Sequence, residues 1–155
     1  MKTGISIFVL IISSVLAFGQ QKTITLSEKK ITDLGATLLC SYNKAAAEKG
    51  DSISYIMILF RDLQLQAAEE YRSVRFPISK NSPEVIQFIK DLRAGYARMD
   101  SRTEMSWKRD LYTISVNESH GLLFIEDSKN GGYTGMSKSS VEQLLEWLGK
   151  IGFKA

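Results

Sequence analysis

The chain has 155 residues, of which 20 are basic and 17 acidic, and its formal net charge is +3. This charge is too small to indicate a nucleic-acid partner by itself. The apolar share of 44% excludes a disordered chain and indicates a packed globule. A single cysteine excludes an internal disulfide, so the core alone must stabilise the fold.

The N-terminal stretch has the layout of a secretory signal peptide. Lys2 precedes an apolar run over 5–16, and the small-x-small pattern at 17–19 places cleavage before Gln20. The alternative is a retained membrane anchor, but the run is shorter than the roughly 20 apolar residues that span a bilayer. Gln20 as a first residue also resembles exported proteins of the Bacteroidetes group. We therefore expect a signal peptide over 1–19, no transmembrane segment after cleavage, and a periplasmic or secreted protein.

Four strand-like segments follow in the first half of the chain. They cover 22–30, 36–42, 53–60 and 71–79, where strand-favouring residues are frequent or apolar and polar residues alternate. Both faces of the third segment are apolar, so this strand is either covered on both sides or central beneath a helix. Pro77 cannot donate a ladder hydrogen bond, so the fourth strand should end there or lie at a sheet edge.

An amphipathic helix is predicted after these strands. Ser82 can cap its free amides, Pro83 is tolerated in its first turn, and Glu84 suits the positive end of the helix dipole. Its apolar stripe is made of Val85, Ile89, Leu92 and Tyr96.

The second half of the chain repeats this plan. Strand-like segments cover 103–108, 111–117, 121–127 and 133–137, and the sequence SKNGG before the last one is a hairpin signal. The second helix is predicted to begin with the capping-box pattern Ser139 to Glu142. Its apolar stripe consists of Val141, Leu144, Leu145, Leu148 and Ile151.

The two predicted helices match each other at one constant offset. Val85, Gln87, Phe88, Ile89 and Leu92 align with Val141, Gln143, Leu144, Leu145 and Leu148, which indicates a duplication. The alternative is that any amphipathic helix after a strand looks similar. We expect an α+β fold with two tandem ββββα units, each an antiparallel sheet followed by a helix. They would form one globular domain over 20–155, with pseudo-repeats at about 20–98 and 99–155.

This order of elements, together with the stretch GYTGMSKSSVEQLLEWL from Gly132 to Leu148, resembles the whirly and transcriptional-coactivator family. In that family a unit is four antiparallel strands and a helix, and whirly proteins carry it twice. The resemblance covers the order of elements over most of the chain after the signal peptide. It implies single-stranded DNA binding by aromatic and basic side chains on the sheet. The residues that could serve this role are Tyr55, Arg61, Tyr71, Arg72, Arg75, Tyr112 and Tyr133. The small charge and the export signal favour the alternative, in which these tyrosines pack and the arginines are solvated.

The sequence offers little to a catalytic hypothesis. It contains no G-x-S-x-G elbow, P-loop or G-x-G-x-x-G motif, and one histidine with one cysteine cannot make a conventional zinc site. Cys40, in a strand pattern, is interpreted as a small buried hydrophobe. The neighbouring acids Glu126 and Asp127 point to opposite faces of a strand and make no acid–base pair. We predict no catalytic residue, no metal site and no cofactor.

The preferred hypothesis is an exported, non-catalytic binding domain for a protein, a peptide or an envelope component. Trp107 and Trp147 would either close the core or anchor a partner. The alternatives are a single-stranded nucleic-acid-binding protein and an enzyme with an unrecognised site. The candidate binding residues are Tyr71, Arg72, Arg75, Tyr112, Tyr133 and Trp147.

Overall fold

The computed structural model describes residues 23–33, 36–46, 52–64, 70–101, 103–117 and 121–154. The predicted signal peptide lies outside these residues. Within them, no helix is long and apolar enough to cross a membrane.

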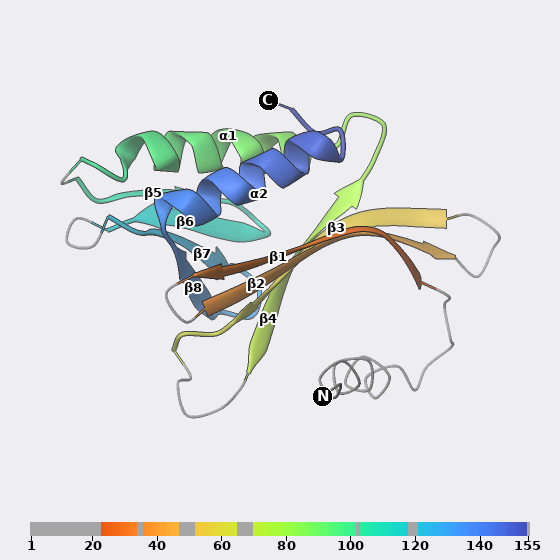
Figure 1. Cartoon of the computed structure of the whole chain (residues 1–155), viewed down its shortest axis with the longest axis horizontal. Helices are drawn as coiled ribbons and strands as arrows, with labels where there is room; N and C mark the ends of the chain where they lie inside the picture. The colour runs from red at the N-terminus through yellow and green to blue at the C-terminus, as the bar shows by residue number, and fades with distance from the viewer. Residues whose placement is uncertain are drawn as a thin grey trace, which may run out of the picture.

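The fold is α+β, as predicted: two antiparallel four-stranded sheets, each followed by a helix (Figure 1). The first sheet has the order β1-β2-β3-β4 and the second the order β5-β6-β7-β8. The first unit contains β1 (Thr23–Asp33), β2 (Ala36–Ala46), β3 (Ser52–Arg61), β4 (Tyr71–Ile78) and α1 (Pro83–Arg98). The second unit contains β5 (Met105–Lys108), β6 (Tyr112–Val116), β7 (Leu123–Asp127), β8 (Tyr133–Met136) and α2 (Lys138–Lys150).

The strands of the first sheet differ from the prediction mainly in length. β2 continues through the polar stretch to Ala46, because backbone pairing with β3 extends to Ala45–Ile53 and Ala46–Ser52. Backbone hydrogen bonds of this kind do not depend on the polarity of the side chains. The expectation for Pro77 is confirmed, since it lies in β4, the edge strand of the sheet.

The strand β3 lies between β2 and β4, so its predicted central position is correct. One of its faces is fully buried, with Ile56, Ile58 and Phe60 at 0% exposure. The other face is half-buried at Tyr55, Met57 and Leu59 and exposed at Ile53, so the alternative that the strand is covered on both sides is wrong.

α1 begins where it was predicted, with Ser82 at the N-cap position and Pro83 in the first turn, but the predicted side-chain cap is absent, and α2 has a different cap from the predicted one. Ser82 precedes α1 in a left-handed conformation (φ 39°, ψ 54°), and its side chain makes no cap bond. Its hydroxyl instead donates to the Ser79 carbonyl oxygen at 3.0 Å. In α2 the cap is Ser137, not Ser139: Ser137 has the extended backbone that a cap requires, and its side chain accepts from the Ser140 amide.

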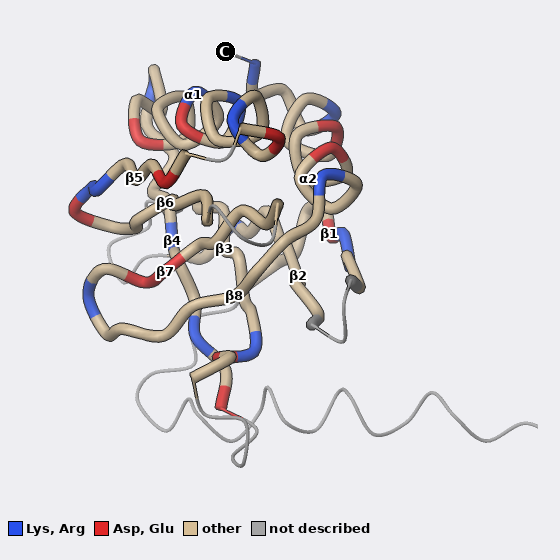
Figure 2. The backbone as a smooth tube through the Cα atoms, turned by 90° about the vertical axis from the view of Figure 1, so that its left-hand side faces the viewer, with Lys and Arg blue, Asp and Glu red and all other residues tan. Residues whose placement is uncertain are grey.

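The two helices lie side by side and each reaches the sheet of the other unit (Figures 1 and 2). α1 contacts β5 and β6 as well as β4, and α2 contacts β1 as well as β8. The ring of Phe88 on α1 lies 5.0 Å from the ring of Tyr112 on β6, centroid to centroid. The buried apolar side chains of both units consequently form one hydrophobic core.

Candidate functional site

The first sheet has a second face, here called the outer face, whose side chains alternate with the buried ones. The register places Leu39 opposite Leu59, Met57 opposite Arg75, and Arg61 opposite Tyr71. By the same alternation the outer face contains Glu28 and Lys30 on β1, Leu39, Ser41 and Asn43 on β2, Ile53, Tyr55, Met57, Leu59 and Arg61 on β3, and Tyr71, Ser73, Arg75 and Pro77 on β4.

A short apolar strip lies on the outer face, next to the buried and hydrogen-bonded polar pair Ser41 and Asn43 of β2. Leu39, Met57 and Leu59 are half-buried neighbours on β2 and β3. Ile53 and Tyr71 lie towards its two ends and are 56% and 50% exposed, which makes them two of the four most exposed large apolar side chains of the described residues. A strip of half-buried apolar side chains with an exposed one towards each end is typical of contact surfaces.

The charges on the outer face are mostly positive. Among the described residues of this face, the cations are Lys30, Arg61 and Arg75 and the acid is Glu28. The Arg75 guanidinium carbon lies 5.8 Å from the centre of the Tyr55 ring, a cation–π contact that holds the arginine over the sheet. The outer face therefore combines an apolar strip with a basic border.

The second sheet presents a different surface. The side chains opposite its buried face include Ser106, Thr113, Ser115 and Glu126, which are small or polar. Its two aromatic rings, Phe124 and Tyr133, pack edge to face at 5.8 Å and so partly cover each other. This comparison selects the first sheet as the candidate contact surface.

The structure divides the predicted binding residues into three groups. Tyr71 and Arg75 lie on the same face of β4, the outer face of the first sheet, four residues apart. Arg72 points to the opposite side of β4, where its Nε is 3.4 Å from Asp62 Oδ2 and its Nη2 is 3.1 Å from Glu70 Oε2. Tyr133 lies on the second sheet against Phe124.

Tyr112 and Trp147 form the third group and belong to the core. Tyr112 is 2% exposed, and its hydroxyl donates to Asp91 Oδ2 at 2.9 Å. Trp147 is 5% exposed, and its Nε1 donates to Ser27 Oγ at 3.0 Å. Of the two alternatives for Trp147, the structure shows the one in which it closes the core. Trp107 is half-buried and packs against the same core.

Sequence reasoning missed a buried carboxylate at Asp91 in α1. Asp91 is 3% exposed and accepts four hydrogen bonds: from Arg109 Nε at 2.8 Å, Arg109 Nη2 at 2.9 Å, Gln87 Nε2 at 2.8 Å and the Tyr112 hydroxyl. Burial by itself would raise the pKa of Asp91, but the bonds from Arg109, Gln87 and Tyr112 outweigh it and lower the pKa below 3.8. An acid directly beside Leu92 of the predicted apolar stripe was the available sequence signal.

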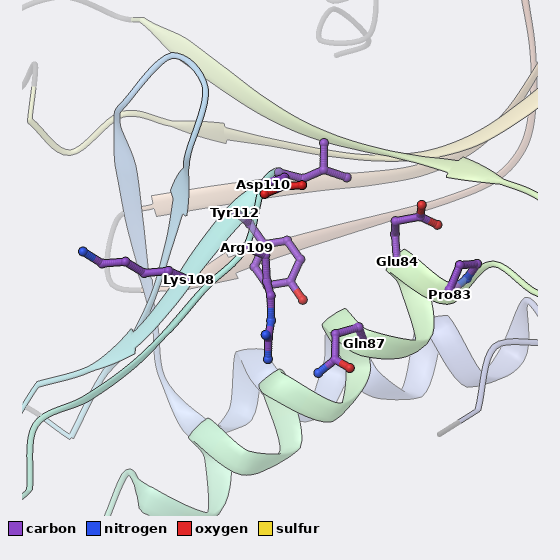
Figure 3. Close-up of a pocket in the computed structure, with 8 residues that line it drawn as sticks. Pro83, Glu84, Gln87, Lys108, Arg109, Asp110 and Tyr112 are labelled. Atoms are coloured by element: carbon purple, nitrogen blue, oxygen red, sulfur yellow. The ribbon is translucent and has the colours of Figure 1, made fainter.

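An open pocket of about 490 Å³ lies beside this carboxylate, between the start of α1 and the segment that joins β5 to β6 (Figure 3). It is lined by Pro83, Glu84, Gln87, Lys108, Arg109, Asp110, Leu111 and Tyr112. Its size falls within the range of about 300–1,000 Å³ that is usual for small-ligand sites.

A second buried acid, Asp62, joins the two sheets. Asp62 is 1% exposed and accepts from the backbone amides of Gln64 at 2.9 Å and Tyr133 at 3.3 Å. Burial would raise the pKa of Asp62, but these two bonds and Arg72 lower it below its ordinary value. The acid thus ties the end of β3 to the start of β8.

The described residues contain no group of three or more histidine, cysteine, aspartate or glutamate side chains that could hold a metal ion. Cys40 is fully buried, and this burial raises the pKa of its thiol to about 12. The interpretation of Cys40 as a core residue is confirmed, because a thiol in this state is neither accessible nor ionised at neutral pH.

Comparison with protein-family models and with curated proteins gives no match to this chain. The class that the structure defines is architectural: an α+β chain of two ββββα units whose helices share one core. Its function is therefore inferred from the chemistry of its surfaces.

Proposed function

We propose that this chain is an exported, non-catalytic binding domain that holds an acidic polypeptide segment against the outer face of the first sheet. The observation that carries this proposal is the apolar strip of Leu39, Met57 and Leu59 with its basic border. In this interpretation the two ββββα units form a whirly-like arrangement that presents one sheet to its partner.

An acidic polypeptide suits this surface because both its apolar side chains and its carboxylates find partners there. The apolar side chains of the segment would cover the strip, at about 25 cal/mol for each Å² of apolar surface removed from water. Its carboxylates would approach Arg75 and Lys30, and among the described residues of the outer face they would meet one acid, Glu28. Charge complementarity of this kind speeds association and selects among partners.

Single-stranded nucleic acid is the second candidate. Tyr71 is half-exposed and Arg75 lies over the Tyr55 ring, so the outer face also offers stacking groups and cations. The apolar strip between them favours the polypeptide, because a phosphate backbone gains nothing from aliphatic side chains. The small net charge of the chain points the same way.

Fluorescence anisotropy distinguishes the two candidates. The probes are a labelled peptide of alternating leucine and glutamate, the same peptide with glutamine in place of glutamate, and a labelled oligo-dT. We expect saturable binding of the acidic peptide, with weaker binding of the glutamine peptide and of oligo-dT. The variant Arg75→Glu should weaken acidic-peptide binding about tenfold or more.

Lys129→Glu is the matched control, because this exposed residue lies in the turn after β7, away from the outer face. Its affinity for the acidic peptide should equal that of the wild type. Tighter binding of oligo-dT than of the acidic peptide would establish the nucleic-acid alternative. Absence of binding to all three probes, or equal losses in both variants, would eliminate the outer face as the contact surface.

The export part of the proposal has its own test. Intact-mass analysis of the protein recovered from the periplasm or medium of an expressing Gram-negative cell should give a chain that begins at Gln20. A chain retained in the cytoplasm with residues 1–19 still attached would overturn it.

A further inference from the structure

The apolar side chains of the outer face form a ridge along the strand β3. Its outward-facing positions Ile53, Tyr55, Met57 and Leu59, here called the β3 ridge, follow one another on one face, and Leu39 of β2 lies opposite Leu59. A strand rises about 3.3 Å per residue, so the β3 ridge is about 20 Å long. An α-helix rises about 1.5 Å per residue, so about 13 helical residues would cover the same length.

One cation lies on each side of the β3 ridge. Lys30 is on β1 and Arg75 is on β4, and both are exposed on the outer face. β1 and β4 are separated by β2 and β3, so at a spacing of about 4.8 Å between neighbours the two strands lie about 14 Å apart. An α-helix with its side chains is about 10–12 Å wide. A helix laid along the β3 ridge would therefore lie between Lys30 and Arg75, with one cation beside each of its flanks.

The direction of side chains distinguishes a helix from an extended segment on this surface. In an extended segment successive side chains point to opposite sides. A strand that lays its apolar residues on the β3 ridge would consequently point its alternate, acidic residues into solvent. In an amphipathic helix the apolar stripe is about 100° wide, and the residues along its two borders point sideways. Acids at these borders would lie level with Lys30 and Arg75.

The opposite face of the same sheet already receives helices. α1 and α2 lie together on that side (Figure 1), where the ring of Phe88 on α1 is 4.7 Å from the ring of Phe76 on β4, centroid to centroid. Trp147 of α2 donates to Ser27 of β1 on the same side. A helix on the outer face would give the first sheet helices on both faces, a layering that suits a central strand with apolar residues on both sides.

From these observations we propose that the outer face holds its partner as an amphipathic α-helix whose apolar stripe is bordered on both sides by acidic residues. This inference rests on the proposed function, because it names the conformation and the charge pattern of the same acidic segment. The apolar stripe would cover the β3 ridge, and the acids of the two borders would pair with Lys30 and Arg75. Glu28, two residues from Lys30 on β1, would repel an acid placed beside it and so restrict the register of the helix.

Fluorescence anisotropy with three labelled peptides tests the inference. Each peptide has about 18 residues, long enough to cover the β3 ridge as a helix, and all three contain the same leucines, glutamates and alanines in different orders. The first has leucines at helical spacing and glutamates along both borders of the leucine stripe. The second has its glutamates on the face opposite the leucines, and the third alternates leucine with glutamate. We expect the first to bind at least about tenfold more tightly than the other two. The ¹³Cα chemical shifts of the labelled first peptide should report a helix in the complex.

Two charge reversals test the position of the helix between the cations. Lys30→Glu and Arg75→Glu should each weaken binding of the first peptide about tenfold and change binding of the second by less than about twofold. Lys129→Glu, in the turn after β7, should change neither. A loss in only one of the two variants would overturn the position of the helix between Lys30 and Arg75.

The outcomes separate this inference from the proposed function. If the alternating peptide binds as tightly as the first, or if the first peptide is extended in the complex, the helical partner is wrong and the acidic polypeptide partner stands. If none of the three peptides binds, the proposed function is wrong and this inference falls with it.

Discussion

Asp91 and Arg109 form a two-point ion pair between α1 and the segment that precedes β6. Arg109 Nε lies 2.8 Å from Asp91 Oδ2, and Arg109 Nη2 lies 2.9 Å from Asp91 Oδ1. The carboxylate is buried and the guanidinium is partly exposed. This pair joins the helix of the first unit to the sheet of the second.

Substitution of Asp91 by asparagine should destabilise the protein. The change leaves Arg109 without its charged partner and Tyr112 with a weaker acceptor. We expect a loss of about 2–3 kcal/mol, because unpaired buried groups cost about 1–3 kcal/mol and the partly exposed Arg109 can be rehydrated. Urea denaturation measures this loss. Asp110 is exposed and next to Arg109 in the chain, so the control Asp110→Asn should change the free energy of unfolding by less than about 0.5 kcal/mol. Equal losses in the two variants would contradict the stabilising role of Asp91.

The stability of the protein should fall in acid. The folded-state pKa values of Asp91 and Asp62 are both lower than the ordinary value of 3.8. Their contribution is fully present above the pKa of the unfolded state and is lost as the pH falls through the lower folded-state pKa, from about pH 5 downwards. Denaturation at a series of pH values should show this decline. The slope should be smaller in Asp91→Asn, and an unchanged slope would show that Asp91 does not contribute.

Two adjacent glycines provide a matched test of the contact between the sheets. Gly131 and Gly132 both have positive φ, at +72° and +85°, so alanine at either position costs about 1–2 kcal/mol of backbone strain. A Cβ on Gly132 would also collide with the Asp62 carboxylate and lie 2.8 Å from Arg72 Cγ, whereas one on Gly131 meets nothing within 4 Å. Gly132→Ala should therefore lower the melting temperature more than Gly131→Ala. Equal shifts would mean that Asp62 and Arg72 move aside freely.

Substitution of Thr134 by valine should stabilise the protein. Its Oγ1 is buried and has no hydrogen-bond partner among the described residues, although its neighbours on β8 are well packed. Valine has nearly the same shape without the unsatisfied hydroxyl, so Thr134→Val should raise the free energy of unfolding by about 1 kcal/mol. Thr113→Val removes a hydroxyl that lies 3.2 Å from Ser128 Oγ, and it should give no such gain. Destabilisation by Thr134→Val would indicate a partner for this hydroxyl.

Cys40 should not react with thiol reagents while the protein is folded. Its side chain is fully buried and its pKa of about 12 keeps the thiol protonated. Ellman's reagent at mildly alkaline pH should give one thiol per chain in concentrated guanidinium chloride and almost none in buffer. Rapid reaction in buffer would contradict the buried position.

The sequence predicted the order of the elements because each strand and helix carries its own periodicity. Tyr112 alternates with Ile114 and Val116, so its burial could also have been read from that pattern. The residue that caps α2 was harder to predict from the sequence, because several serines stand before this helix and only the backbone geometry selects Ser137. The partners of Asp91 could not be predicted, since Arg109 and Tyr112 belong to the other unit. Such contacts depend on how the units pack, which periodicity does not encode.

Each helix packs on the sheet of the other unit, and this exchange has a consequence for biosynthesis. Trp147, close to the C-terminus, bonds to Ser27 near the beginning of the described chain, and α2 packs on β1. When the first unit has left the ribosome, its sheet still lacks α2 and its own helix still lacks β6. A nascent chain therefore cannot complete its core until nearly all of it has been translated. The same long-range closure predicts that two separately expressed halves would depend on each other to fold.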